Sequence, residues 1–149
     1  MYINEMSETG GINTSRGIVY DGKGRGKVYA KAGAAITAGT VYALSYDEDG
    51  REAVAVGTSK TGMMVGVAEK SLASGEYGWF VVEGEIDITT PSITTTAGHA
   101  AQFHASTGAI EDSGAAFSGG ADEFGVFTST DSTAGTTHSV YMIPREITF

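Results

Sequence analysis

The sequence contains no cysteine, only two prolines and a single tryptophan among its 149 residues. Without cysteine the chain can form no disulfide bond, thiol nucleophile or cysteine-ligated metal site, and this absence is typical of proteins made in a reducing compartment. No apolar run reaches the roughly 18 residues that a membrane-spanning helix requires. The first residues also lack the basic start and apolar stretch of a secretory signal. We therefore expect a soluble protein that is made in cytoplasm.

The abundant residues favour strands over helices. The chain has 22 glycines and is rich in threonine, serine and valine, which favour short strands and turns. A chain of this length suits one domain and can bury roughly 70% of its unfolded surface without covalent support. We expect an all-β fold, in the form of a compact small β-barrel or sandwich of short antiparallel strands.

An alternating stretch predicts one long strand. From residue 80 to residue 88, apolar side chains occupy one parity and carboxylates occupy the other. The apolar set is Phe80, Val82, Ile86 and Ile88, and the acidic set is Glu83, Glu85 and Asp87. Successive side chains of a strand point to opposite faces of the sheet. The apolar set should therefore face the core, and the acidic set should face water or a partner.

Residues 28 to 149 should form a single β domain, in which two similar halves span about 28–88 and 86–143. Small-residue landmarks recur in the same order about 59 residues apart. The earlier set is Ala38-Gly39, Gly50, Gly66-Val67 and Gly75, and the later set is Ala97-Gly98, Gly108, Gly125-Val126 and Gly135. A half of this size has few strands with which to close a core alone. The two halves should therefore pack on each other.

Residues 1 to 27 should form an extended N-terminal arm, because glycines interrupt every periodic pattern there. Residues 1 to 31 carry five basic and three acidic side chains, a net charge of +2, whereas the remainder carries four basic and fifteen acidic ones, a net charge of −11. Opposite charges favour docking of the arm on a neighbouring acidic protein, and a frayed terminus without a role stays open as the alternative. The candidate partner-binding residues are Ile12, Arg16, Ile18, Val19, Tyr20, Lys23, Arg25 and Lys27.

The acidic motifs do not predict a catalytic or metal site. The acidic stretch that begins at Asp47 resembles the start of a calcium loop, but an EF-hand needs an acidic ligand eleven residues later, where Thr58 stands. A hairpin turn ending at Gly50 is expected instead. The carboxylates between residues 83 and 87 have the spacing of a glycosidase pair. Alternation on an exposed strand produces the same spacing, so we interpret them as a solvated face.

The histidines and the overall charge also exclude several functions. His99 and His104 are five residues apart, a spacing that puts them on opposite faces of a strand, and His138 is isolated. No serine lies in the Gly-x-Ser-x-Gly motif of a hydrolase. The net charge of −9 disfavours nucleic acid as a partner, because that binding needs a concentrated basic surface. We predict no catalytic, cofactor-binding or metal-binding residue.

Four short motifs follow one another between residues 28 and 90. They are Ile36-Thr-Ala-Gly-Thr-Val41, Val65-Gly-Val-Ala68, Leu72-Ala-Ser-Gly75-Glu, and Trp79-Phe-Val-Val-Glu-Gly-Glu-Ile86. Together they resemble the capsid decoration, or cement, proteins of tailed bacteriophages, although the long glycine-rich arm departs from the simplest members. The resemblance implies a non-enzymatic β-rich protein without a cofactor. Such a protein binds the major capsid protein on the outside of an icosahedral shell and stabilises capsomer junctions as a homo-oligomer, often a trimer. It would be made in the host cytoplasm and lie on the virion exterior.

Two other classes of function stay open. One is a β-rich adhesion or carbohydrate-binding module on a virion or cell surface. Sugar-binding sites usually stack several aromatic rings on pyranose faces, and Trp79 is the only tryptophan, but seven tyrosines keep this class in consideration. The other is an enzyme whose site no motif reveals. Binding to immobilised glycans would separate the first of these classes from a cement protein.

Overall fold

The computed structural model describes residues 11–13, 17–47, 50–57 and 61–148. Within these ranges the chain forms twelve strands and no helix, so the expected all-β fold is confirmed. In chain order the strands are β1 (Gly11–Asn13), β2 (Ile18–Tyr20), β3 (Gly26–Ala32), β4 (Val41–Asp47), β5 (Gly50–Ala55), β6 (Thr61–Ala68), β7 (Tyr77–Thr95), β8 (His99–Phe103), β9 (Ile110–Ala116), β10 (Glu123–Phe127), β11 (Asp131–Met142) and β12 (Glu146–Thr148). The described residues accordingly contain no helix able to cross a membrane.

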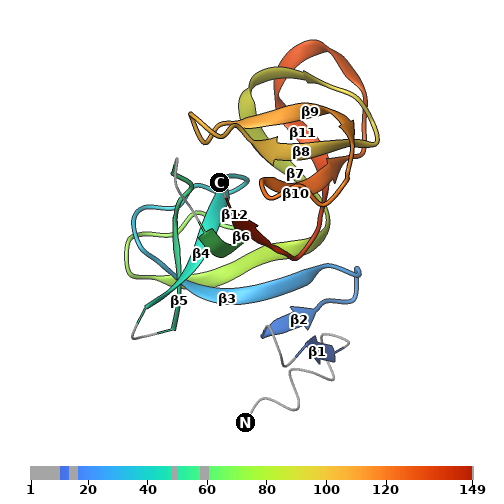
Figure 1. Cartoon of the computed structure of the whole chain (residues 1–149). Helices are drawn as coiled ribbons and strands as arrows, with labels where there is room; N and C mark the ends of the chain where they lie inside the picture. The colour runs from blue at the N-terminus through green and yellow to red at the C-terminus, as the bar shows by residue number, and fades with distance from the viewer. Residues whose placement is uncertain (1–10, 14–16, 48–49, 58–60, 149) are drawn as a thin grey trace.

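Five strands close a small barrel in the order β3, β5, β4, β6 and β7, with β7 pairing back to β3. Neighbouring strands are antiparallel except β3 and β5, which pair in parallel where Lys31 lies opposite Glu52. Strands β4 and β5 form the expected hairpin, in which Asp47 pairs with Gly50. The barrel is the lower of the two lobes in Figure 1, where β2 lies beside β3.

The upper lobe has the same strand order as the barrel. Strands β9, β8, β10, β11 and β7 follow one another there, as β5, β4, β6, β7 and β3 do in the barrel. The turns match as well, since Gly39 donates its amide to the carbonyl of Ala68, and Gly98 donates its amide to the carbonyl of Phe127. Both glycines have positive φ angles, of 83° and 89°. A duplication would produce this arrangement, and the duplication itself stays a prediction.

Strand β7 belongs to both lobes. Its first part pairs with β3 and β6, and from Gly84 onward it pairs with β11. Gly84 has a φ of 100°, a conformation that glycine adopts readily and other residues avoid. A Cβ atom at this position would lie only 3.2 Å from the Cα of Arg25. Glycine is therefore required where β7 passes from one lobe to the other (Figure 1).

Each lobe has its own hydrophobic core. The core inside the barrel contains Ile18, Val28, Ala30, Ala32, Ile36, Tyr42, Leu44, Ala53, Met64, Ala68, Phe80 and Val82. The core of the upper lobe contains Val41, Val65, Val67, Ile88, Ala101, Phe103, Ile110, Phe124, Phe127, Val140 and Met142. The second set includes three valines from β4 and β6, which are strands of the barrel.

Strand β6 shows how one wall serves both cores. Met64 and Ala68 pack inside the barrel, whereas Val65 and Val67 pack in the upper lobe. Alternate side chains of a strand point to opposite faces, so this part of the wall is buried on both sides. Full burial of a valine side chain contributes about 1.5–3 kcal/mol. The shared wall therefore holds the two lobes together.

The alternation predicted for residues 80 to 88 agrees with the structure. Phe80, Val82 and Ile88 are buried, Ile86 and Glu83 are half-buried, and Glu85 and Asp87 are exposed. Val81 has the parity of the acidic residues and is nevertheless fully buried. It pairs with Val67, whose side chain lies in the upper core. The upper lobe thus covers the outer face of the barrel at this point.

The structure places residues 18 to 27 on the barrel, which differs from the extended arm expected up to residue 27. Strand β2 pairs with β3, where Val19 lies opposite Lys27. Ile18 is fully buried in the barrel core. Tyr20 packs against the same core and donates its hydroxyl to a carboxylate oxygen of Glu83 at 2.6 Å. Burial of these apolar side chains outweighs the conformational freedom of the neighbouring glycines. Residues 1–10 and 14–16 lie outside the described residues.

Candidate functional site

The eight candidate partner-binding residues do not share one environment. Ile12 belongs to β1, its side chain is not among those described, and Arg16 lies outside the described ranges. Ile18 is buried, Val19 and Tyr20 are half-buried, Lys23 is exposed, and Arg25 and Lys27 are half-buried with acidic partners. Among those whose side chains are described, Lys23 is therefore the residue best placed to meet a partner.

Lys27 joins two turns of the barrel by ion pairs. Its ammonium lies 3.1 Å from Oδ2 of Asp21, in the turn between β2 and β3, and 2.8 Å from Oε1 of Glu69, in the turn after β6. The other carboxylate oxygen of Asp21 accepts hydrogen bonds from the backbone amides of Lys23 and Arg25, at 2.8 and 3.0 Å. These bonds fix the shape of the turn that presents Lys23.

The ion pairs and amides shift two pKa values. Burial acts to raise the pKa of Asp21, but the backbone amide of Arg25, the Lys27 ammonium and the amide of Lys23 outweigh it and hold the pKa below 3.8. Burial likewise acts to lower the pKa of Lys27, and its two carboxylate partners, Glu69 and Asp21, outweigh it and hold the pKa above 10.5. Asp21 and Lys27 are therefore both charged at neutral pH.

A groove of about 710 Å³ lies beside the β2–β3 turn. Lys23 and Arg25 of the turn line it, together with Glu85 and Asp87 of β7. Tyr141 of β11, which is 44% exposed, also lines the groove. The groove therefore offers both signs of charge and an accessible aromatic ring, which suits a polar segment of another protein.

Three exposed aromatic rings lie together on the outer face of the barrel, and we call Tyr29, Tyr77 and Trp79 the aromatic platform. The three side chains are 53%, 47% and 42% exposed. Tyr29 of β3 lies opposite Trp79 of β7, with ring centroids 5.1 Å apart in an edge-to-face arrangement. The ring of Tyr29 also stacks on that of Tyr77, with centroids 5.7 Å apart and planes 13° apart. Each ring supports another, so the platform is held in place by its own members.

A hollow of about 450 Å³ adjoins the platform. Charged side chains line it beside the rings, namely those of Lys27, Glu69 and Lys70. Gly78 lines it too, and a Cβ atom there would lie 2.8 Å from the side chain of Leu72. The hollow thus combines aromatic faces with an ammonium donor and a carboxylate acceptor.

Trp79 stands out in the sequence as the single tryptophan, whereas no motif predicted that Tyr29 and Tyr77 lie beside it. A signal was available in β3, where Val28 and Ala30 have the inward parity of an alternating strand. Tyr29 then has the outward parity, and an aromatic residue at an outward position is an informative exception. The pairing that brings Tyr29 to Trp79 could not be found from this alternation.

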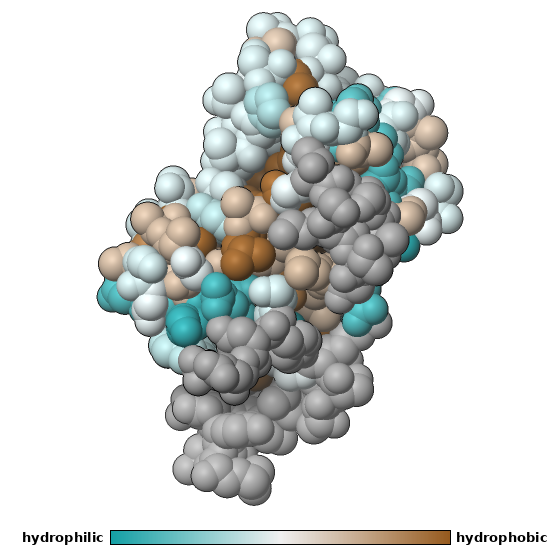
Figure 2. All heavy atoms as spheres, turned by 60° about the vertical axis from the view of Figure 1, so that its left-hand side comes forward, coloured by the Kyte–Doolittle hydropathy of each residue, from teal (hydrophilic) through white to brown (hydrophobic). Residues whose placement is uncertain are grey.

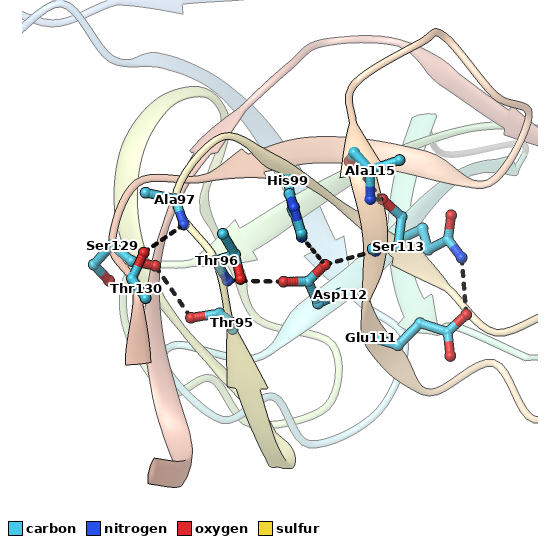
Figure 3. Close-up of polar contacts among 12 residues, drawn as sticks. Thr95, Thr96, Ala97, His99, Glu111, Asp112, Ser113, Ala115, Ser129 and Thr130 are labelled. Carbon is cyan, nitrogen blue, oxygen red and sulfur yellow. Dashed lines mark hydrogen bonds and ion pairs between the residues drawn. The ribbon is translucent and has the colours of Figure 1, made fainter. Parts of the chain in front are cut away.

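Polar side chains gather at the far end of the upper lobe (Figure 3). One carboxylate oxygen of Asp112 lies 2.8 Å from Nδ1 of His99 and accepts the backbone amide of Gly114 at 2.7 Å. The other accepts the backbone amide of Thr96 at 2.8 Å. Asp112 thereby joins the β7–β8 turn to β9, and both of its carboxylate oxygens accept hydrogen bonds from backbone amides. We interpret this cluster as structural.

His138 also has a structural environment and is not isolated. Its side chain is buried, its Nε2 donates to the carbonyl of Gly135 at 2.8 Å, and its Nδ1 lies 2.7 Å from Oδ2 of Asp131. These contacts fold back an irregular part of β11, where the pairing register with β7 shifts. Within the described ranges, no three or more histidine, aspartate or glutamate side chains are grouped closely enough to hold a metal ion.

One face of the molecule shows how apolar atoms are distributed at the surface. In Figure 2, apolar atoms of the coloured residues form small patches between near-neutral and hydrophilic ones. The described large hydrophobic residues that are exposed are all aromatic, namely Tyr29, Tyr77, Trp79 and Tyr141. Three of these four residues form the aromatic platform, and Tyr141 lines the groove.

Comparison with known proteins finds a similar fold among solved structures. No protein-family model matches the sequence, and no curated protein sequence matches it. The fold is similar to that of a phage head-fibre base. The crystal structure of the N base of head fibre gp8.5 in bacteriophage phi29 aligns with this chain at a TM-score of 0.53 and 13% sequence identity. The alignment covers 83% of this chain and 98% of that chain. At this identity the comparison shows a shared fold.

Proposed function

We propose that this protein is a structural component of a phage virion, which binds the outer surface of an icosahedral capsid and stabilises it at capsomer junctions. The observation that carries the proposal is the similarity to the phi29 head-fibre base, since the shared fold spans 98% of that chain. The motifs between residues 28 and 90 that resemble capsid cement proteins support it independently. The proposed role is non-enzymatic and places the protein on the virion exterior.

The proposed partners are the major capsid protein and further copies of this chain. A small shell-stabilising protein gains affinity when it meets several capsomers at once, because linked contacts raise the effective concentration of each one. A homotrimer provides three such contacts. Light scattering should therefore report a mass near three times 15.3 kDa, and a monomer at every concentration, both alone and on the shell, would contradict this part of the proposal.

The groove at the β2–β3 turn is the proposed contact with the capsid. Lys23 is exposed there, and its turn is fixed by the bonds to Asp21. The candidate residues Ile12 and Arg16, which precede this turn in the chain, are further proposed contacts with the capsid. An electrostatic contact at the rim of an interface mainly changes the association rate and its dependence on salt.

Co-sedimentation with capsids that lack this protein tests the proposal. The wild-type protein should sediment with the capsids and raise the temperature at which they open. Lys23→Glu should weaken binding severalfold, whereas Lys70→Glu, a matched charge reversal outside the groove, should bind like wild type. A wild-type protein that stays in the supernatant at every concentration would overturn the proposed function.

A further inference from the structure

We infer that the aromatic platform, formed by Tyr29, Tyr77 and Trp79, and the adjoining hollow bind a saccharide that contains pyranose rings. This site is separate from the groove proposed for the capsid. The proposed ligand stacks an apolar face of one sugar ring on the platform and places its hydroxyl groups in the hollow. A virion component with such a site would carry a glycan-binding surface in addition to its structural role.

The rings have the chemistry that a sugar face requires. The face of an aromatic ring is negatively polarised, so it attracts the weakly positive C–H groups on the apolar side of a pyranose. Between 42% and 53% of each platform side chain is exposed, so ring surface is accessible to a ligand. Mutual packing of the rings at 5.1 and 5.7 Å means that little freedom is lost when a ligand stacks on them.

The hollow supplies the polar partners. Oε1 of Glu69 is buried against Lys27, so the second oxygen of this carboxylate is the acceptor that remains, and Lys70 offers an ammonium group. Hydroxyl groups of a sugar can donate to this oxygen and accept from this ammonium group. The ion pair between Lys27 and Glu69, at 2.8 Å, holds the carboxylate at this place. A volume of about 450 Å³ lies within the roughly 300–1,000 Å³ of small-ligand sites.

A protein partner fits the platform less well. The centre of a protein–protein interface is depleted in lysine and glutamate, and a stable one buries about 800 Å² on each partner. Here Lys27, Glu69 and Lys70 line the same hollow as the rings. Among the described residues, the large apolar side chains exposed at this site are those of the three platform residues, and all three are amphipathic aromatics. The surroundings therefore favour a hydroxyl-rich ligand over an apolar protein surface.

The single tryptophan of the chain makes the site directly observable, because all tryptophan fluorescence comes from Trp79 in the platform. The full-length protein would first be screened on immobilised glycans. It would then be titrated with β-1,4-linked trimers of glucose and of N-acetylglucosamine, with maltotriose and with sialyllactose, while Trp79 emission is followed. We expect at least one of these probes or the arrayed glycans to bind and to change the emission in a saturable manner.

Two variants and one control locate the binding. Tyr29→Ala and Tyr77→Ala each remove a platform ring and keep Trp79, so each should lower the affinity about tenfold, which corresponds to ~1.4 kcal/mol. Tyr141→Ala removes an exposed ring of the groove and should leave sugar binding unchanged. Thermal melts would identify a variant that fails to fold, and the other platform variant then decides.

Three results would overturn the inference: no glycan binds, the platform variants bind sugar like wild type, or Tyr29→Ala impairs capsid binding or self-association while no glycan binds. The last result would assign the platform to a protein contact. Because co-sedimentation with capsids is measured separately, failure of the saccharide site is distinguishable from failure of the proposed capsid role.

Discussion

Val82 and Asp87 lie on the same strand in opposite environments. Val82 has no exposed surface inside the barrel, whereas Asp87 is exposed. Val82→Asp would bury a charge among apolar side chains that offer no partner, which should cost about 4 kcal/mol or more and prevent soluble expression or folding. Asp87→Lys should change the melting temperature little. If the two variants had the same melting temperature, the assignment of Val82 to the buried face of β7 and of Asp87 to the exposed face would be contradicted.

At the scale of single residues, sequence reasoning succeeded where one strand carried its own pattern. The alternation between residues 80 and 88 sufficed to place Val82 inside and Asp87 outside. It could not place Val81, because the burial of that side chain depends on a second lobe lying over the barrel. The same limit applies to Tyr29, whose contact with Trp79 exists only because β3 and β7 close the barrel.

Among the elements, β7 depends on glycine at the point where it changes partners. Gly84 has a φ of 100°, and an added Cβ would lie 3.0 Å from the Cγ and 3.2 Å from the Cα of Arg25. Gly84→Ala should therefore destabilise the fold by roughly 1–3 kcal/mol. Gly22→Ala is the matched control, because a Cβ there has no described neighbour within 4 Å. In urea unfolding, Gly84→Ala should lower the midpoint of the transition. Gly22→Ala should have a midpoint close to that of wild type.

The two turns that Lys27 joins should respond to pH. Lys27→Met keeps an apolar stem but removes the charge, and partly exposed ion pairs of this kind contribute about 1 kcal/mol or less. The lowered pKa of Asp21 means that its contribution is present above pH 3.8 and is lost as the pH falls through the lower, folded value. The raised pKa of Lys27 means that its contribution is present below pH 10.5 and is lost as the pH rises through the higher, folded value.

The stability difference between wild type and Lys27→Met should therefore be largest between about pH 4 and pH 10 and shrink towards both extremes. Urea titrations across this range measure it directly. A difference that stayed constant from acid to alkaline pH would contradict the assignment of the ion pairs. High salt should reduce the difference, since these groups are partly exposed to solvent.

The pairing of elements was harder to foresee than their existence. Hairpins such as β4–β5 follow from a turn between two apolar runs, and this one was predicted from the residues around Gly50. The expectation of short antiparallel strands missed the parallel pair of β3 and β5. The long strand predicted over residues 80 to 88 exists, and as β7 it extends over 19 residues. Local patterns do not specify which edges meet when a sheet closes. For the same reason, the sequence did not predict that residues 18 to 27 lie on the barrel, where Ile18 is buried.

For the whole molecule, two deletions separate N-terminal residues that are expected to bind the capsid from those that stabilise the fold. Removing residues 1 to 16 keeps Ile18 and Tyr20, so the body should stay folded with a melting temperature close to that of wild type. Capsid binding of this variant should be weaker at low salt, and added salt should reduce wild-type binding towards the same level. Removing residues 1 to 24 also deletes the fully buried Ile18, so it should lower the melting temperature clearly.

A matching control separates the two effects of deletion. Ile18→Ala in the full-length chain should cost about 2–5 kcal/mol through a cavity in the barrel core and should leave capsid binding intact below its melting temperature. If the shorter deletion bound capsids like wild type at low and at high salt, the N-terminal residues would have no part in that contact.

The wall of β4 and β6, buried on both faces, also determines how the protein comes apart. Detaching the upper lobe would expose Val41, Val65 and Val67 to water while the barrel lost the support behind its wall. Neither lobe then has a stable state of its own, so unfolding should be cooperative over the whole chain. Calorimetry should show one transition whose van't Hoff and calorimetric enthalpies agree, as in a two-state protein. Local damage to either lobe is therefore resisted by the stability of both.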